Sequence, residues 1–463
     1  MEIRREKKPI LFSLSPLFYL TLAILFFKLI FTVTYPHHIA LLVSGLLSFL
    51  QRIKSSRLFL FSSIRKNFQS VLPAMEILVF VGMLIAAFAH VGVLTTMIQI
   101  GLLWIQPIMF LPAICIASAL AALVSGSSWT TAGTLGVAFM GVGEVLGFPN
   151  VMTAGAIVSG CYFGDKLSPL SDTTNLASSL THVRITDHIF HMLKTTCISF
   201  LISVFLYLIL NCFVLNSFSL NDRSLDSIPF DFHFQKNISW KHLIPVVLVF
   251  GSSLLRFHVR ICLVLGILSS YLLLENPIQN LFDFLHSLIF GYQSTTGDQR
   301  LDTFLSGGGI AAILSTEALI LSAVWFGGVV EGMGYLLELL NRIKTYILNQ
   351  SDLLLACMGT SFFLNLVTAD QYLSLVIPAR AYRNLASENA VPAKDVSRSL
   401  EDSGTITSPL IPWNSCGAFM SASLGVSVLN YLPFVFFNLI HVSLAVLFLV
   451  WKKKKEKVRV FTV

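Results

Sequence analysis

GDKLSPLSDTTNLA, residues 164–177, is a polar segment around a proline, and apolar sequence flanks it on both sides. It contains two aspartates, one lysine, one asparagine and four hydroxyl side chains. A carboxylate at the centre of a bilayer costs at least about 2.5–3.5 kcal/mol, so ionisable side chains kept there usually have a function. If the flanking sequence spans a membrane, this segment is a candidate functional site.

The rest of the chain has the composition of a membrane protein. Of its 463 residues, 55% are hydrophobic and 12% charged, and the mean hydropathy is +0.77. Apolar runs recur along the chain, each close to the roughly 20 residues that a helix needs to cross a bilayer. They cover residues 10–33, 71–89, 105–124, 193–213, 310–330 and 431–451. We therefore expect an all-α polytopic membrane protein with roughly 12 transmembrane helices, several of them broken.

Basic residues gather at the ends of these apolar runs, in residues 4–8, 52–66 and 452–459. Cytoplasmic loops of membrane proteins carry such an excess of lysine and arginine. The pattern predicts a multi-pass protein of the cell membrane with both termini in the cytoplasm, and it explains the net charge of +7 without a nucleic-acid partner. The seven cysteines are scattered without a C-x-x-C motif, so we expect no disulfide, no structural metal and no cofactor besides transported ions.

The polar motifs occur in two similar sets. In the first, SGSSWTTAGTLG (125–136) precedes the opening segment; in the second, GTSFFLNLVTADQYLS (359–374) precedes EDSGTITSPLIPWNSCG (401–417). Both later segments contain Asp, then Ser-Pro-Leu, then Asn, which indicates a duplicated unit and leaves open whether its copies are parallel or inverted. We predict an N-terminal helical hairpin with a basic loop (1–70), a first transport repeat (71–215), a polar linker (216–241) and a second repeat with a basic tail (242–463).

The chemistry of these motifs favours an alkali cation. A proline leaves the carbonyl four residues before it without a donor, so the carbonyls of Asp165, Thr405 and Ser408 are expected to line a cavity or bind a ligand. Carboxylate, hydroxyl and carbonyl oxygens are hard ligands. A buried carboxylate that holds either a proton or Na+, but not both, couples the two ions. We expect the two motifs to meet near the middle of the membrane.

Individual roles follow from spacing. We expect Asp172 to carry the ion and the proton, with Na+ held by Asp172, Thr173 and Asn175, and Asp165 to pair mainly with its neighbour Lys166. In the alternative, the segment is a loop at the membrane edge, in which Asp172 caps a helix.

The four motifs 125–136, 164–177, 368–374 and 401–417 resemble signatures of the NhaC-type sodium/proton antiporter family. That family belongs to the wider ion-transporter superfamily and includes malate–lactate antiporters. The resemblance extends over most of residues 71–451 and implies a secondary antiporter with inverted repeats, broken helices and re-entrant hairpins. It also implies these site residues: Ser127, Ser128, Thr130, Asp165, Ser168, Asp172, Thr173, Asn175, Asp370, Asp402, Thr405, Ser408 and Asn414.

The expected function is exchange of Na+ for H+. The alternative is exchange of an organic acid or amino acid coupled to H+ or Na+.

An enzyme is not expected, because YFGD (162–165) has Tyr162 where the G-x-G-D motif of intramembrane proteases has glycine, and SGSSW lacks a convincing histidine partner. A primary pump is not expected either, because the nucleotide-binding motif G-x-x-x-x-G-K-[ST] does not occur and the sequence contains no Gly-Lys pair. The expected partners are the lipid bilayer, Na+ and H+, with a small organic substrate in the alternative; a homodimer is compatible with the sequence.

Overall fold

The computed structural model describes residues 10–29, 36–52, 59–220, 239–295, 302 and 305–461, and these residues form helices joined by short turns. The predicted polar linker lies largely outside the described residues, and residues 53–58 of the N-terminal basic loop and the first nine residues also lie outside them. The first elements are α1 (Ile10–Ser13), α2 (Ser15–Leu29), α3 (Pro36–Gln51), α4 (Leu60–Val91) and α5 (Val93–Trp104). Helices α2 and α3 pack against each other, and α3 and α4 pack against α16 (Gly309–Gly332).

Two groups of helices contain the motifs. The first comprises α6 (Phe110–Ser125), α7 (Ser128–Thr131), α8 (Val137–Val145), α9 (Asn150–Leu167), α10 (Asp172–Leu180) and α11 (Ile185–Leu220). The second comprises α18 (Gln350–Thr368), α19 (Gln371–Glu388), α20 (Ala393–Leu400), α21 (Ser415–Leu424), α22 (Val428–Tyr431) and α23 (Phe436–Phe461). In the sequence, five further helices lie between the two groups: α12 (Ile244–Leu254), α13 (Val259–Leu272), α14 (Leu281–Phe290), α16 and α17 (Tyr335–Lys344).

Six described helices are long and apolar enough to cross a membrane. They are Leu60–Val91, Pro107–Ser125, Ile185–Asn216, Gly309–Gly332, Gln350–Thr368 and Phe436–Lys454. One further pair, Ser415–Leu424 with Val428–Phe434, passes the same test together and is bent by 85°. Five shorter apolar helices accompany them. The expected all-α polytopic membrane fold is confirmed, and the broken and short helices explain why hydropathy predicts only a rough number of crossings.

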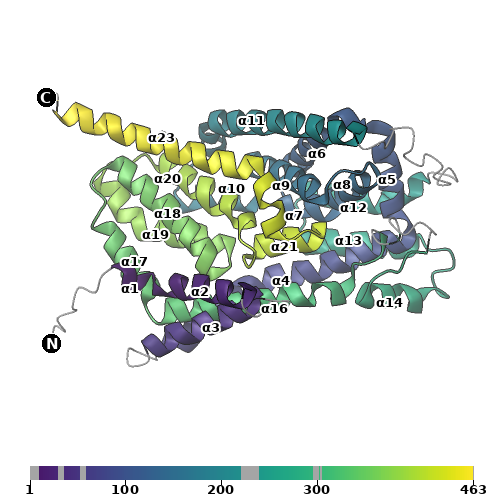
Figure 1. The fold of residues 1–463 in the computed structure, drawn as a ribbon, viewed down its shortest axis with the longest axis horizontal. Helices are drawn as coiled ribbons and strands as arrows, with labels where there is room; N and C mark the ends of the chain where they lie inside the picture. The colour runs from purple at the N-terminus through teal and green to yellow at the C-terminus, as the bar shows by residue number, and fades with distance from the viewer. Residues whose placement is uncertain are drawn as a thin grey trace.

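The last helices of the two groups run in opposite directions. Tyr207 of α11 packs on Phe436 at the start of α23, whereas Ser199, earlier in α11, contacts His441, later in α23. Figure 1 shows these two helices along one edge of the molecule, α3, α4 and α16 along the opposite edge, and the broken helices between them. Matched helices that are antiparallel are what an inverted pair of repeats requires.

Two glycines bring α9 against α6. A Cβ at Gly160 would lie 2.2 Å from the Cys115 carbonyl oxygen, and one at Gly164 would lie 2.1 Å from that of Ala119. Small residues spaced by four allow helix backbones to approach closely in membranes. This packing places Asp165, the next residue, beside the break between α6 and α7.

Gly164→Ala is therefore expected to destabilise the protein by about 1–3 kcal/mol, as overpacking of a tight interface does. Thermal unfolding of the detergent-purified protein measures this. Gly359→Ala is the matched control, because a Cβ there would meet nothing within 4 Å. Equal melting temperatures for the two variants would contradict the tight contact.

Candidate functional site

The starts of four helices surround one cavity of about 310 Å³. Ser128, Asp172, Gln371 and Ser415 are the first residues of α7, α10, α19 and α21, and all four line it. The residue before each of them caps its helix: the side chains of Ser127, Ser171, Asp370 and Asn414 accept hydrogen bonds from backbone N–H groups of the first turn. Two of the helices belong to each group, so the cavity lies between the proposed repeats.

Local backbone geometry makes these breaks. Gly126 and Ala369 adopt left-handed conformations, with φ of 70° and 58°, at the ends of α6 and α18. Helix α9 ends at Leu167, before the extended residues Ser168 and Ser171 that flank Pro169. In the second group, Glu401–Thr405 is a π-helical turn, and Ser408–Leu410 forms a single tight turn before α21. The expected interruption of both Ser-Pro-Leu segments is confirmed.

Three carboxylates reach the cavity. Asp165 is buried and accepts a hydrogen bond from the Ser128 hydroxyl at 2.7 Å. Asp370 is buried, and its carboxylate accepts from the backbone N–H of Leu373 at 2.7 Å. Asp172 is exposed on the cavity wall. Among the described residues that line this cavity there is no lysine, arginine or histidine. The lining can thus offer oxygen ligands and negative charge to a cation.

The expected pairing of Asp165 with Lys166 is wrong. The Lys166 ammonium is fully buried and lies 2.8 Å from the Asp402 carboxylate. Neighbouring residues on a helix point to different faces, so Asp165 faces the cavity while Lys166 faces the second motif. The expectation that the two motifs meet is confirmed by this ion pair and by a 3.3 Å hydrogen bond from Thr173 to Glu401.

The three backbone carbonyls that were expected to lack a donor because of the prolines all accept hydrogen bonds within the protein. The Asp165 carbonyl accepts from the Ser168 N–H at 3.1 Å, and the Thr405 carbonyl accepts from the Ser408 hydroxyl at 2.7 Å. The Ser408 carbonyl accepts from the Ile411 N–H at 3.4 Å. Backbone and hydroxyl donors within the breaks replace the donors that proline removes, so these carbonyls need no cation.

Six of the predicted site residues line the cavity: Ser127, Ser128, Asp165, Asp172, Thr173 and Asp370. Others hold the breaks in place. The Asn175 amide donates to the carbonyls of Pro169 and Ser171, and the Ser168 hydroxyl donates to the Leu123 carbonyl. The Thr130 hydroxyl donates to Ser127, and the Asn414 amide donates to Asn365. Thr405, Ser408 and Asp402 are buried in the second motif, outside the lining.

The sequence motifs do not identify several lining residues and one buried acid. Gln371, Tyr372 and Ser415 line the cavity directly after the caps Asp370 and Asn414. Their position after a polar cap in an apolar run is a signal that could have identified them. Glu401 is fully buried beside Asp402, and the similarity between the two motifs does not identify it because that similarity starts at the aspartate.

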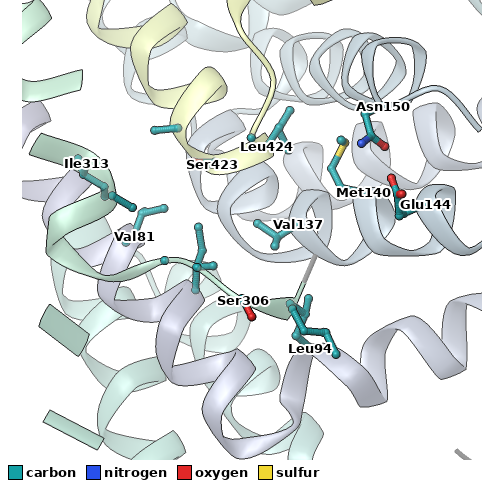
Figure 2. A pocket seen from close by; sticks show the side chains of 18 residues that line it. Val81, Leu94, Val137, Met140, Glu144, Asn150, Ser306, Ile313, Ser423 and Leu424 are labelled. Atoms are coloured by element: carbon teal, nitrogen blue, oxygen red, sulfur yellow. The ribbon is translucent and has the colours of Figure 1, made fainter. Parts of the chain in front are cut away.

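A larger cavity of about 610 Å³ lies farther along α4. It is lined by Val81, Ile85, residues 305–308, Glu144, Asn150 and the end of α21, and Figure 2 shows Glu144 close to Asn150 with Ser423 and Leu424 on another wall. Helix α21 joins the two cavities, since Ser415 lines the first and Ser423 the second. Between these positions Phe419 stacks on Trp129, with ring centroids 4.3 Å apart.

Comparison with known proteins gives consistent matches. A model of the Na+/H+ antiporter family matches residues 160–453. The Na+/H+ antiporter NhaC of Alkalihalophilus pseudofirmus is 34% identical over 80% of each chain. The arginine/ornithine antiporter ArcD of Halobacterium salinarum is 35% identical over 85% of this chain and 82% of its own, and the malate-2H+/Na+-lactate antiporter of Bacillus subtilis is 30% identical over 92% of each.

Proposed function

Because this chain belongs to the Na+/H+ antiporter family, and is thus an antiporter of the membrane, we propose that it exchanges Na+ for H+ in the cavity between its four helix starts. The observation that carries this proposal is the lining itself: Asp165, Asp172 and Asp370 meet there without a basic side chain among the described lining residues. Desolvated carboxylates need a compensating positive charge, which either a proton or a cation supplies.

Exchange follows when the same carboxylate takes the two ions in turn. When carboxylate and hydroxyl oxygens bind Na+, the cation neutralises the carboxylate and no proton is required. When Na+ leaves, a proton binds the carboxylate and neutralises it before the site opens to the opposite side of the membrane. Asp165 and the Ser128 hydroxyl form the buried part of this site, and Asp172 and Thr173 the adjoining wall. Trp129 lines this cavity and stacks on Phe419, which lies on α21 between Ser415 and Ser423, and we expect ions to pass between the two cavities only when these rings part.

A second candidate substrate is a small amino acid or organic acid. The cavity volume of about 310 Å³ lies at the lower end of the roughly 300–1,000 Å³ typical of small-molecule sites. The starts of α10, α19 and α21 supply backbone N–H groups that suit a substrate carboxylate, while the aspartates suit an amine. Relatives named for arginine/ornithine and malate–lactate exchange make this worth testing.

Transport measured with the purified protein in proteoliposomes distinguishes Na+ from an organic substrate. A pulse of Na+ outside vesicles with a preset pH gradient should produce proton movement that Li+, K+, malate, lactate, arginine and ornithine do not match. Proton movement or counterflow with an organic substrate and none with Na+ would replace the first proposal by the second.

We also propose that the chain ends face the cytoplasm. Helix α1 and the C-terminal end of α23 lie at the same end of the molecule, and α14 lies at the other end (Figure 1). In a cysteine-free background, Ser56→Cys is expected to react with a membrane-impermeant maleimide only after the cells are opened, and Glu275→Cys in intact cells. The reverse pattern would invert the topology.

A further inference from the structure

The hairpin formed by α12 and α13 ends beside the cavity of about 310 Å³ that is proposed to bind Na+, the cation cavity. Each of the two helices is too short to cross a membrane alone. The turn before α12 contacts α5, where the His242 Nδ1 lies 3.1 Å from the Thr96 hydroxyl. At the other end of α12, the Ser253 hydroxyl donates to the Ser125 carbonyl at 2.9 Å. The connection between α12 and α13 therefore lies at the break between α6 and α7.

Helix α13 starts beside the middle of α4 and runs in the same direction. In the first turn of α13, the Arg260 Nη1 lies 2.8 Å from the Glu76 Oε2. Farther along both helices, a Cβ at Gly266 would lie 2.7 Å from the Leu84 side chain. Helix α13 thus packs on α4 from Glu76 toward Val91, and the hairpin ends partway along α4.

The ion pair of Glu76 and Arg260 lies at the edge of the cation cavity. Ile77, which follows Glu76, and Val259, which precedes Arg260, both line the cavity. Glu76 and Arg260 themselves do not line it. The pair therefore joins the α4 wall of the cavity to the α13 wall, outside the set of side chains that would coordinate a cation.

This edge of the cavity is accessible to water. The side chains of Glu76 and Arg260 are 45% and 47% exposed, although Glu76 lies near the middle of a helix long enough to cross a membrane. Charged side chains within a membrane span almost always face the protein interior or a water-filled space, because hydrocarbon solvates them poorly. The gap between α4 and the start of α13 is therefore an aqueous approach to the cavity.

The tip of the hairpin is basic. Arg256 and His258 are exposed, as Arg260 is, and His258 interacts electrostatically with Asp172 of the cavity lining. Positive side chains beside a cation site oppose the approach of Na+. Glu76 pairs with this tip through Arg260 and removes part of that repulsion.

We propose that Glu76 and Arg260 form the entrance of the cation cavity and set how readily Na+ enters it. The inference rests on the proposed Na+/H+ exchange. Glu76 cancels the charge of Arg260 at the entrance, and Arg260 in turn keeps Glu76 from holding Na+ outside the cavity. Because neither side chain lines the cavity, the two act on the access of the cation and not on its coordination.

Removing each charge in turn should give effects of opposite sign. In proteoliposomes at fixed pH, E76Q leaves Arg260 unpaired and should raise the apparent KM for Na+ by about three- to tenfold, whereas R260Q should lower it by a similar factor. These factors lie within the about 2- to 30-fold that Coulomb's law gives for one charge at roughly 8 Å, between bulk water and a protein surface. Maximal rates should stay near that of the wild type. Both shifts should shrink in about 1 M choline chloride, where the Debye length is about 3 Å.

The exposed ion pair of Arg184 and Asp187 provides the matched control. R184Q and D187N remove the same charges away from the entrance and should leave the apparent KM for Na+ as in the wild type. The reversed pair E76R/R260E should return the KM toward the wild-type value, which damage to folding would not do.

Labelling tests the entrance without transport. In a cysteine-free background, Glu76→Cys should react with a membrane-impermeant maleimide from the same side of the membrane as Ser56→Cys. A thiol at residue 76 that reacts from neither side, or only from the opposite side, would overturn the inference.

Two kinetic results would also overturn it. In one, E76Q and R260Q shift the apparent KM for Na+ in the same direction or leave it unchanged. In the other, both variants are monodisperse yet inactive, which would make the pair part of the transport step and not of the entrance. Absence of any Na+/H+ exchange in the wild type is a different result, because it overturns the proposed function itself, while the labelling still tests the entrance.

Discussion

Asp165→Asn is expected to abolish Na+-dependent proton release from proteoliposomes while the protein still folds. Asparagine keeps the shape and the hydrogen bond from the Ser128 hydroxyl, but it can neither titrate nor compensate a cation. Loss of a supporting ligand alone typically lowers metal affinity by 10- to 100-fold. We therefore expect the apparent affinity for Na+ to fall by at least about 100-fold.

Asp172→Asn tests how much Asp172 contributes to Na+ binding and exchange compared with Asp165. Asp172 is exposed on the cavity wall, so its carboxylate is better solvated than that of the buried Asp165. We expect weaker Na+ binding with residual exchange. The control is Asp187→Asn, which removes an exposed carboxylate of α11. Exchange that survives in Asp165→Asn and fails in Asp172→Asn would return the main role to Asp172, as spacing alone predicts. Survival in both would exclude each of these two aspartates as the carboxylate that Na+ and H+ share.

Asp402→Asn is expected to destabilise the protein by about 3 kcal/mol, the lower end of the cost of breaking a buried ion pair. Lys166 is completely buried and would lose its ion-pair partner, as would His441 and Arg398. Glu401 nearby would compensate part of the loss. The measurement is thermal unfolding of the purified protein in detergent, with Asp187→Asn as the control.

The double variant Lys166→Gln/Asp402→Asn tests whether the loss of stability comes from leaving one buried charge without its partner. Removing both charges of a buried pair often costs little, so the double variant should melt above Asp402→Asn alone. A double variant that melts lower than either single variant would show that the two side chains do not compensate each other.

The sequence predicts the class of fold and the segments of the site well, because both depend on local features. Polar residues and prolines inside apolar runs are enough to identify the breaks around Pro169 and Pro409. Which side chains meet across the breaks is not local. Lys166 reaches Asp402 because it is one position, about 100° of helix, away from Asp165.

The hydrogen-bond donors that pair with the backbone carbonyls at the breaks are equally hard to predict from local sequence. Proline indicates a missing donor, but whether a nearby hydroxyl supplies another depends on the path of the break. Asn175 illustrates this, because its amide donates to two carbonyls of its own turn. Its residue type suits a cation ligand, and the fold uses it to hold the backbone.

The close contact of α9 with α6 also bears on how the protein moves. With carbonyl oxygens of α6 lying where side chains would begin at Gly160 and Gly164, the two helices cannot slide past each other without a clash. They travel as one rigid piece, and this piece carries both Ser128, just beyond the end of α6, and Asp165. In the proposed exchange, Ser128 and Asp165 would therefore already stand together before the cation binds, and they would stay together through the cycle. What would change between the two sides of the membrane is the rest of the lining, contributed by α10, α19 and α21.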